Sequence, residues 1–231
     1  ELQELPKLPN SLQKFWCYEN KLQELPELPN SLKILSCSHN LLQELPELPN
    51  SLQKLYCYKN ELQELPVLPN LLEELDCSIN KLQYLPEILN VIYLICMNNK
   101  LQHLPELPKS LTYFNCSNNY IQELPYINNL NLYNYMYKQI RESNEEYGYS
   151  FCNNNIKYIS AKYFNESENM HLKKVLSYCN LENNLIVHND IYNELVPKNN
   201  WIIDWWEDNY EIYRKRENNQ ANNYEYNHHN Q

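Results

Sequence analysis

The chain has 231 residues, 13 prolines, one glycine, eight cysteines and a formal net charge of −10. Such an acidic chain lacks the clustered Lys and Arg that neutralise phosphates, so we expect neither a nucleic-acid partner nor an anionic membrane surface. No apolar run is long enough to span a membrane, and a single glycine excludes a glycine-rich phosphate loop.

One pattern of 20 residues recurs from the first residue onward. Four near-copies fill residues 1–80, a unit one residue shorter spans 81–99, a full unit spans 100–119, and a partial seventh begins at Tyr120. Self-similarity at a short fixed period predicts a solenoid, in which each unit buries its leucines against its neighbours. We therefore predict a repeat domain over residues 1–127 with about six and a half repeats.

Each unit reads L-x-x-L-x-C-x-x-N-x-L-x-x-L-P-x-L-P, as from Leu52 to Pro69. This is the leucine-rich repeat pattern with Cys in place of the third leucine. The short unit and its L-x-x-L-P-x-L-P arm resemble the leucine-rich repeat domains of secreted bacterial effectors of the IpaH and YopM type. The resemblance implies an α/β-type repeat protein, a curved solenoid with a parallel β-sheet on its concave face and an extended convex side. The prolines independently favour an extended, polyproline II arm, because Pro fixes φ and disfavours a helix at the residue before it.

The strand of each coil is expected around the inward Leu and Cys, as in residues 54–58, where side chains alternate between core and surface. Stacking turns each inward position into a column. We interpret the cysteines as reduced packing thiols, because their spacing is the repeat period and not that of a metal site or disulfide framework. This also suggests a reducing, intracellular setting. The cysteine column contains Cys17, Cys37, Cys57, Cys77, Cys96 and Cys116.

A second inward column consists of asparagines. A buried carboxamide both donates and accepts, so we expect it to satisfy the turning backbone of neighbouring coils and not to bind a ligand. The asparagine column contains Asn20, Asn40, Asn60, Asn80, Asn99 and Asn119.

The outward strand positions differ from coil to coil, although the inward ones do not. Their Trp, Tyr, Ile and Met side chains favour a binding face, because rigid aromatics offer contact area at little entropic cost. The alternative is that aromatic residues simply favour strands. The predicted partner-binding residues of the concave face are Lys14, Trp16, Tyr18, Ile34, His39, Lys54, Tyr56, Tyr58, Asp76, Tyr93, Ile95, Met97 and Tyr113.

The two ends of the chain lead to separate expectations. Because Glu1 opens on the arm of a repeat and terminal repeats normally need a cap, we expect a fragment or processed chain whose N-terminal cap is missing. Residues 128–216 are expected to form a small, mainly helical capping or docking region. Its helices are predicted at about 130–146, 168–179 and 200–216. Residues 217–231 lack apolar periodicity and are predicted to be a disordered tail.

An enzyme is a further alternative, because the IpaH branch joins its repeats to a ubiquitin-ligase domain with a Cys-x-Asp motif. No such motif occurs here. A nucleophilic site from Cys179, His171 or His188, and Asp190 has no support in its spacing. A zinc site from Cys152, His171, Cys179 and His188 lacks a close ligand pair. We therefore expect no catalytic residue, metal or cofactor.

These observations predict a non-catalytic module that binds a protein partner through its concave face, with no small-molecule substrate. An alternative is a two-part adaptor whose C-terminal region recruits a host enzyme such as the ubiquitin machinery. The abundance of Asn and Tyr resembles the leucine-rich repeat proteins of giant DNA viruses. We expect an intracellular protein, in the host cytoplasm if it is viral or an effector.

Overall fold

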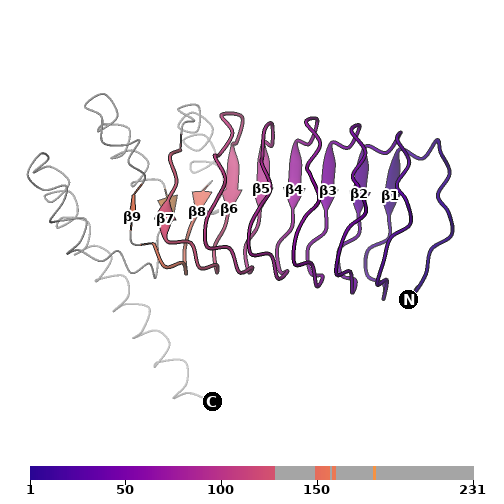
Figure 1. Cartoon of the computed structure of the whole chain (residues 1–231), viewed down its shortest axis with the longest axis horizontal. Coiled ribbons are helices and arrows are strands. Elements are labelled where there is room, and N and C mark those ends of the chain that lie inside the picture. Colours follow the sequence, from indigo (N-terminus) through magenta and orange to yellow (C-terminus); the bar gives the residue numbers. More distant parts are fainter. Residues whose placement is uncertain (128–148, 157, 160–178, 181–231) are drawn as a thin grey trace, which may run out of the picture. The chain divides into compact units, whose positions relative to one another are not determined.

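The computed structural model describes residues 1–127, 149–156, 158–159 and 179–180 (Figure 1). Within these residues the regular elements are short parallel strands joined by extended arms and turns. The predicted parallel-strand solenoid is confirmed, and the arms within residues 1–127 contain no helix. The first six repeats contribute β1 (Lys14–Trp16), β2 (Ile34–Ser36), β3 (Lys54–Tyr56), β4 (Glu74–Asp76), β5 (Tyr93–Ile95) and β6 (Tyr113–Asn115).

The strands pair so that equivalent positions of neighbouring repeats lie side by side. Leu35 of β2 is the partner of Phe15 in β1 and of Leu55 in β3. The repeat that is one residue short keeps this register, because Glu74 still pairs with Tyr93. The period of the sequence thus becomes a set of side-chain columns that run across the sheet.

Leucine side chains fill the interior of the coils. The strand leucines Leu35 and Leu55 have no accessible surface, and the arm leucines Leu25 and Leu28 are at most 8% exposed. A single coil is too thin to enclose a core, so the buried leucines of an inner coil are covered by the coils on both sides. Full burial of a leucine contributes about 1.5–3 kcal/mol, which makes the stacking of coils the main source of stability.

The residue before each internal asparagine has a positive φ, from 53° to 56°. This left-handed residue turns the chain out of the strand and into the arm. Asn tolerates the conformation well, and Asn98 and Asn118 occupy two of these positions. Ile79 occupies another, where its β-branched side chain strains the backbone.

The sheet continues beyond β6. Strand β8 (Tyr149–Ser150) pairs with β6, and β10 (Cys179–Asn180) pairs with β8. Next to them, β7 (Glu123–Leu124) and β9 (Tyr158–Ile159) form a two-stranded parallel sheet. Residues 149–156 therefore repeat the strand and turn of the earlier coils.

The predicted C-terminal helices at about 130–146 and 200–216, and the tail at 217–231, lie outside the described residues. The helix predicted at about 168–179 also lies outside them, except for its last residue. At Cys179 that prediction is wrong, because this residue begins β10. Pairing with β8 satisfies the backbone there in place of a helical turn. The division of the chain at residue 127 stays a prediction.

Candidate functional site

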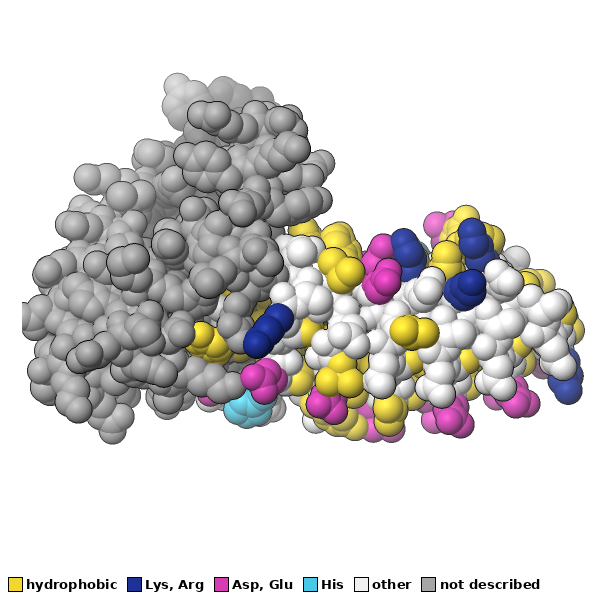
Figure 2. Space-filling view, turned by 90° about the horizontal axis from the view of Figure 1, so that it is seen from above, with side chains coloured by type: hydrophobic (Ala, Val, Ile, Leu, Met, Phe, Trp, Pro, Cys, Tyr) yellow, Lys and Arg dark blue, Asp and Glu magenta, His cyan; other side chains and the backbone are white. Residues whose placement is uncertain are grey.

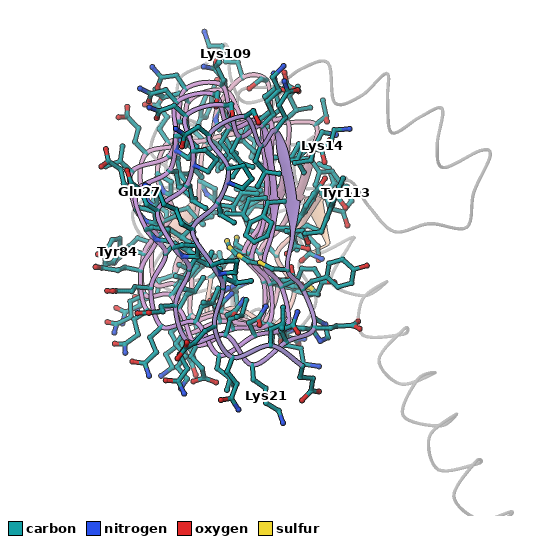
Figure 3. All side chains as sticks on the ribbon, turned by 90° about the vertical axis from the view of Figure 1, so that its right-hand side faces the viewer. Lys14, Lys21, Glu27, Tyr84, Lys109 and Tyr113 are labelled. Carbon is teal, nitrogen blue, oxygen red and sulfur yellow. The ribbon has the colours of Figure 1, made fainter. Side chains whose placement is uncertain are left out.

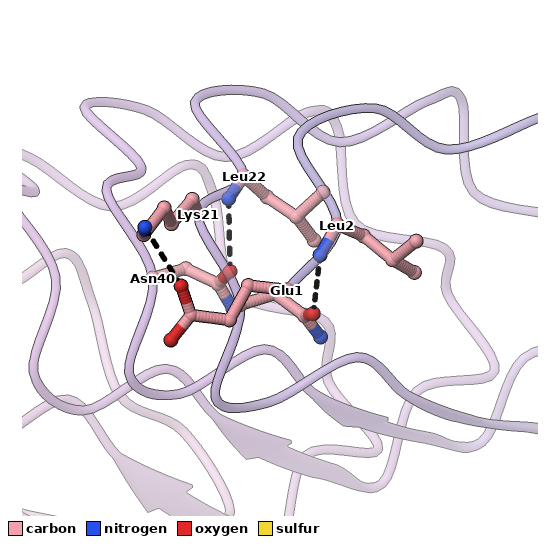
Figure 4. A network of polar contacts seen from close by, with 6 residues as sticks. Glu1, Leu2, Lys21, Leu22 and Asn40 are labelled. Atoms are coloured by element: carbon pink, nitrogen blue, oxygen red, sulfur yellow. Dashed lines mark hydrogen bonds and ion pairs between the residues drawn. The ribbon is translucent and has the colours of Figure 1, made fainter.

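The asparagine column binds the backbone of the solenoid. Asn40 Oδ1 accepts a hydrogen bond from the Leu22 N–H at 3.0 Å. Its Nδ2 donates to the carbonyl oxygens of Cys17 at 2.9 Å and Cys37 at 3.0 Å. Figure 4 shows this contact beside the equivalent one from Leu2, together with the ion pair between Lys21 and Glu1. The carboxamide thus connects two coils, and both of its polar atoms are bonded to the backbone.

The same contacts recur along the solenoid. In each later coil, the asparagine Oδ1 accepts a hydrogen bond from the leucine N–H that lies two residues after the preceding asparagine of the column. Its Nδ2 donates to the carbonyl oxygens of two cysteines. These asparagines are Asn60, Asn80, Asn99 and Asn119. Asn154 extends the column by accepting from Ile121 N–H at 3.0 Å and donating to Cys116 O at 3.0 Å. Asn154 was not among the predicted residues of the column, although the run Phe-Cys-Asn-Asn-Asn around it repeats the earlier turn.

The cysteine column is buried, and its six thiols form no disulfide with one another. Burial raises the pKa of Cys17 to about 11 and holds the pKa of Cys57 and Cys77 well above the ordinary value of 9.0. Thiolate is the nucleophilic and metal-binding form, so neutral, inaccessible thiols suit packing. Within the described residues no group of three or more His, Cys, Asp or Glu side chains could hold a metal ion.

The strand face is the set of outward side chains on β1 to β6, together with the side chain two residues after each of these strands. Figure 3, viewed along the solenoid, shows Lys14 and Tyr113 on this side and Glu27 and Tyr84 on the opposite side. Trp16 is 58% exposed and Tyr18 is 51% exposed. Lys14 is also exposed. The half-buried members of the predicted contact set are Ile34, His39, Lys54, Tyr56, Tyr58, Asp76, Tyr93, Ile95, Met97 and Tyr113.

His39 lies at the rim of the strand face and not on a strand. It is the left-handed residue of its turn, with φ of 55°. Its ring meets Tyr58 edge to face, with centroids 5.2 Å apart. The structure therefore brings these two predicted residues into direct contact.

A polar cluster occupies the middle of the strand face. Lys54 Nζ lies 2.6 Å from Glu74 Oε1, and the Tyr56 hydroxyl donates to the other carboxylate oxygen. Partial burial opposes ionisation of Glu74, but the bonds from Lys54 and Tyr56 hold its pKa below the ordinary value. The predicted contact set omits Glu74. Its signal in the sequence is a carboxylate one repeat after a lysine in the same column.

The aromatic side chains beyond this cluster are ordered by contact with each other. Tyr93 and Tyr113 stack with ring centroids 4.4 Å apart and an interplanar angle of 11°. Burial and the neighbouring Tyr113 raise the pKa of Tyr93 to about 12, so the Tyr93 ring keeps its hydroxyl proton at neutral pH. Little side-chain entropy remains to be lost when such rings contact another molecule.

Asp76 is on β4, which lies between β3 with Tyr56 and β5 with Tyr93. Its Oδ1 accepts bonds from the Ser78 N–H at 3.1 Å and the Ser78 hydroxyl at 2.6 Å. Burial raises the pKa of Asp76, although both bonds from Ser78 oppose this shift. Asp76 makes no ion pair with any of the described residues.

The arms have a different chemistry from the strand face. Figure 2 shows acidic side chains along one long edge of the described coils, and basic, acidic and hydrophobic side chains mixed along the other. The arms carry exposed acidic residues in every repeat, among them Glu27, Glu47 and Glu87. No helix long and apolar enough to cross a membrane occurs in the part of the chain that the structure describes.

Comparisons with known proteins find similar solved structures, while no protein-family model and no curated protein matches the sequence. One similar structure is YopM from Yersinia enterocolitica WA-314, with a TM-score of 0.58 and 35% identity, covering 68% of this chain and 32% of that chain. Another is YopM of Yersinia pestis, described as a leucine-rich effector protein, with a TM-score of 0.50 and 32% identity. This match covers 67% of this chain and 47% of that chain.

A third similar structure is a Shigella effector leucine-rich repeat domain, with a TM-score of 0.53 and 27% identity. The match covers 76% of this chain and 83% of that domain. The chain therefore spans most of this domain but less than half of either YopM chain. The predicted resemblance to effector leucine-rich repeat domains is confirmed.

Proposed function

We propose that this chain, a leucine-rich repeat solenoid similar to bacterial effector domains, binds a protein partner through its strand face. The observation that carries the proposal is the exposure of Trp16 and Tyr18, 58% and 51%, on the same face as four half-buried tyrosines. Exposed aromatic residues around a shared face are typical of interface hot spots.

The order within the strand face supports the same proposal. The stack of Tyr93 on Tyr113 and the bond from Tyr56 to Glu74 hold these side chains before any partner arrives. A surface that is already ordered loses less entropy on binding, and therefore retains more of its interaction free energy. The buried, neutral thiols of the cysteine column favour an interaction module over a cysteine-dependent enzyme.

The place of action and the wider role are part of the proposal. Two of the similar structures are described as effectors, so we infer an effector-like role for this chain in the cytoplasm of a host cell. The adaptor alternative depends on the C-terminal region at 128–216, most of which lies outside the described part of the chain. It stays a prediction.

Affinity capture from host-cell lysate with matched variants of the full chain tests the binding face. The test variant combines Trp16→Ser with Tyr18→Ser on the strand face. The control combines Tyr84→Ser with Tyr120→Ser, which removes two residues that are each 53% exposed and lie outside the strand face. We expect both variants to keep the circular dichroism spectrum of the parent, because all four side chains are exposed.

The control should retain the partners of the parent chain, and the test variant should lose them. Retention of the same partners by both variants would show that the strand face is not the binding site.

A further inference from the structure

Asp76 carries a charge on the strand face that no other described residue neutralises. The other acidic residue of the face, Glu74, is paired with Lys54 at 2.6 Å. The remaining strand lysine, Lys14, is exposed on β1, three strands away from Asp76 on β4. The face therefore presents one ion pair, one solvated cation and one partly buried, unpaired carboxylate.

The orientation of this carboxylate is already determined. Two hydrogen bonds from Ser78, at 3.1 and 2.6 Å, are made to Oδ1 alone. No bond from the described residues reaches Oδ2. A carboxylate held in this way meets an incoming donor without further loss of side-chain freedom.

The negative charge of Asp76 is not needed for this local structure. On β6 the equivalent residue is Asn115, whose Oδ1 accepts from the Ser117 N–H at 3.1 Å and the Ser117 hydroxyl at 2.5 Å. A neutral amide therefore makes the same turn. A partly desolvated charge costs free energy unless it is paired, so a carboxylate at this position calls for a second explanation.

The neighbours of Asp76 indicate which kind of cation fits. Its partners in register are Tyr56 on β3 and Ile95 on β5, and Tyr93 precedes Ile95 by two residues on that strand. A guanidinium binds a carboxylate and also stacks its plane on aromatic rings, whereas an ammonium is more strongly hydrated. Aromatic and aliphatic side chains around one carboxylate therefore favour arginine over lysine.

We propose that Asp76 receives an arginine side chain of the protein partner, with its guanidinium on the carboxylate and its stem against the neighbouring tyrosines. This inference rests on the proposed binding function of the strand face. Charge complementarity identifies the occupant as an exposed arginine-bearing segment of another protein. Tyr56 and Tyr93 then act as contact residues that keep water from the charged pair.

A displayed library of random 12-residue peptides, selected on the immobilised full chain, tests the proposal. The selected peptides should be enriched in arginine. Synthetic peptides are then titrated against the parent chain, against Asp76→Asn, and against Glu47→Gln, which removes one exposed charge from an arm. Asp76→Asn keeps the acceptor for Ser78, as Asn115 shows, so the fold should be unchanged.

We expect Asp76→Asn to weaken peptide binding at least about tenfold, because a hydrogen bond between charged groups is lost. Replacing the peptide arginine with citrulline, a neutral isostere, should have the same effect on the parent and little effect on Asp76→Asn. Glu47→Gln should bind like the parent. Equal loss on Glu47→Gln would show that only net charge matters and would overturn the proposal.

Other outcomes separate this inference from the proposed function. Some peptides could lose binding to the Trp16→Ser/Tyr18→Ser variant but bind Asp76→Asn as they bind the parent. This result would support the strand face as the binding site and contradict the arginine contact. The arginine contact would also be contradicted if lysine replaced arginine in the peptide without loss of binding affinity. The two proposals fail together if no peptide is selected, or if neither Asp76→Asn nor the Trp16→Ser/Tyr18→Ser variant changes the affinity for the peptides.

Discussion

The side chain of Asn60 accepts a hydrogen bond from the backbone N–H of Leu42 at 3.1 Å, across 18 positions of sequence. The same carboxamide donates to the carbonyl oxygens of Cys37 and Cys57 at 3.0 and 3.1 Å. One side chain therefore satisfies three buried backbone groups in two coils. The continuity of the solenoid depends on this arrangement as well as on its leucines.

Asn60→Ala should lower the free energy of unfolding by about 3 kcal/mol, because it leaves buried donors and acceptors without partners. Asn20→Ala is the matched control. Asn20 is half-buried; its Oδ1 accepts from the Leu2 N–H at 2.7 Å, but its Nδ2 donates within its own coil only, so about 1 kcal/mol is expected there. Urea unfolding followed by circular dichroism measures both. Equal losses would mean that the bond from Asn60 Nδ2 to the Cys37 carbonyl of the previous coil contributes nothing extra.

Ile79→Asn should stabilise the protein by about 1 kcal/mol, because Asn tolerates the left-handed conformation that strains a β-branched residue. Ile79 has φ of 53° and is 43% exposed, so little packing is lost. The reverse change, Asn98→Ile at φ of 54°, should destabilise by a similar amount. Thermal and urea midpoints of the two variants, compared with the parent, should move in opposite directions. Movement in the same direction would refute the backbone explanation.

Ser38 and Ser78 occupy the same column but differ in their hydrogen bonds. The Ser38 hydroxyl is buried with no partner among the described residues, whereas the Ser78 hydroxyl donates to Asp76 at 2.6 Å. Ser38→Ala should therefore be neutral or stabilising by up to about 1 kcal/mol. Ser78→Ala should destabilise by about 1–2 kcal/mol, because Asp76 loses a charge-assisted bond. Urea unfolding distinguishes these outcomes, and a larger loss for Ser38→Ala would contradict the assignment.

The cysteine column should make the protein sensitive to alkali. Burial holds the pKa of Cys57 well above 9.0, so the folded state keeps a thiol proton that the unfolded state releases as pH rises past that value. Unfolding is therefore favoured at higher pH, by about 1.4 kcal/mol per pH unit for each such thiol.

Comparison with Cys57→Ala isolates this contribution, since the two proteins share every other ionisable side chain. The free energy of unfolding of the parent minus that of Cys57→Ala should be constant from pH 6 to 8 and fall above about pH 9. A difference that stays constant up to pH 10 would show that this thiol ionises in the folded state as easily as in the unfolded one.

Much of the fold could be predicted from the sequence, because identical units stacked in parallel convert sequence position directly into spatial column. The repeat period alone places Cys37 beside Cys57 and Asn40 beside Asn60. The prolines of the arms, such as Pro26 and Pro29, likewise exclude helix from local geometry alone. The outward positions follow from strand alternation, so the members of the strand face were predictable. Their role in binding stays a prediction.

Other features depend on contacts between side chains and strands that the period does not specify. The bond from Tyr56 to Glu74 and the stack of Tyr93 on Tyr113 arise from side-chain directions across neighbouring coils. The coil containing Asn154 is separated from the others by a long insertion, so strand pairing and not period sets its register. Local repetition thus determined the columns of this protein, while only the packing of coils decided which residues in them touch.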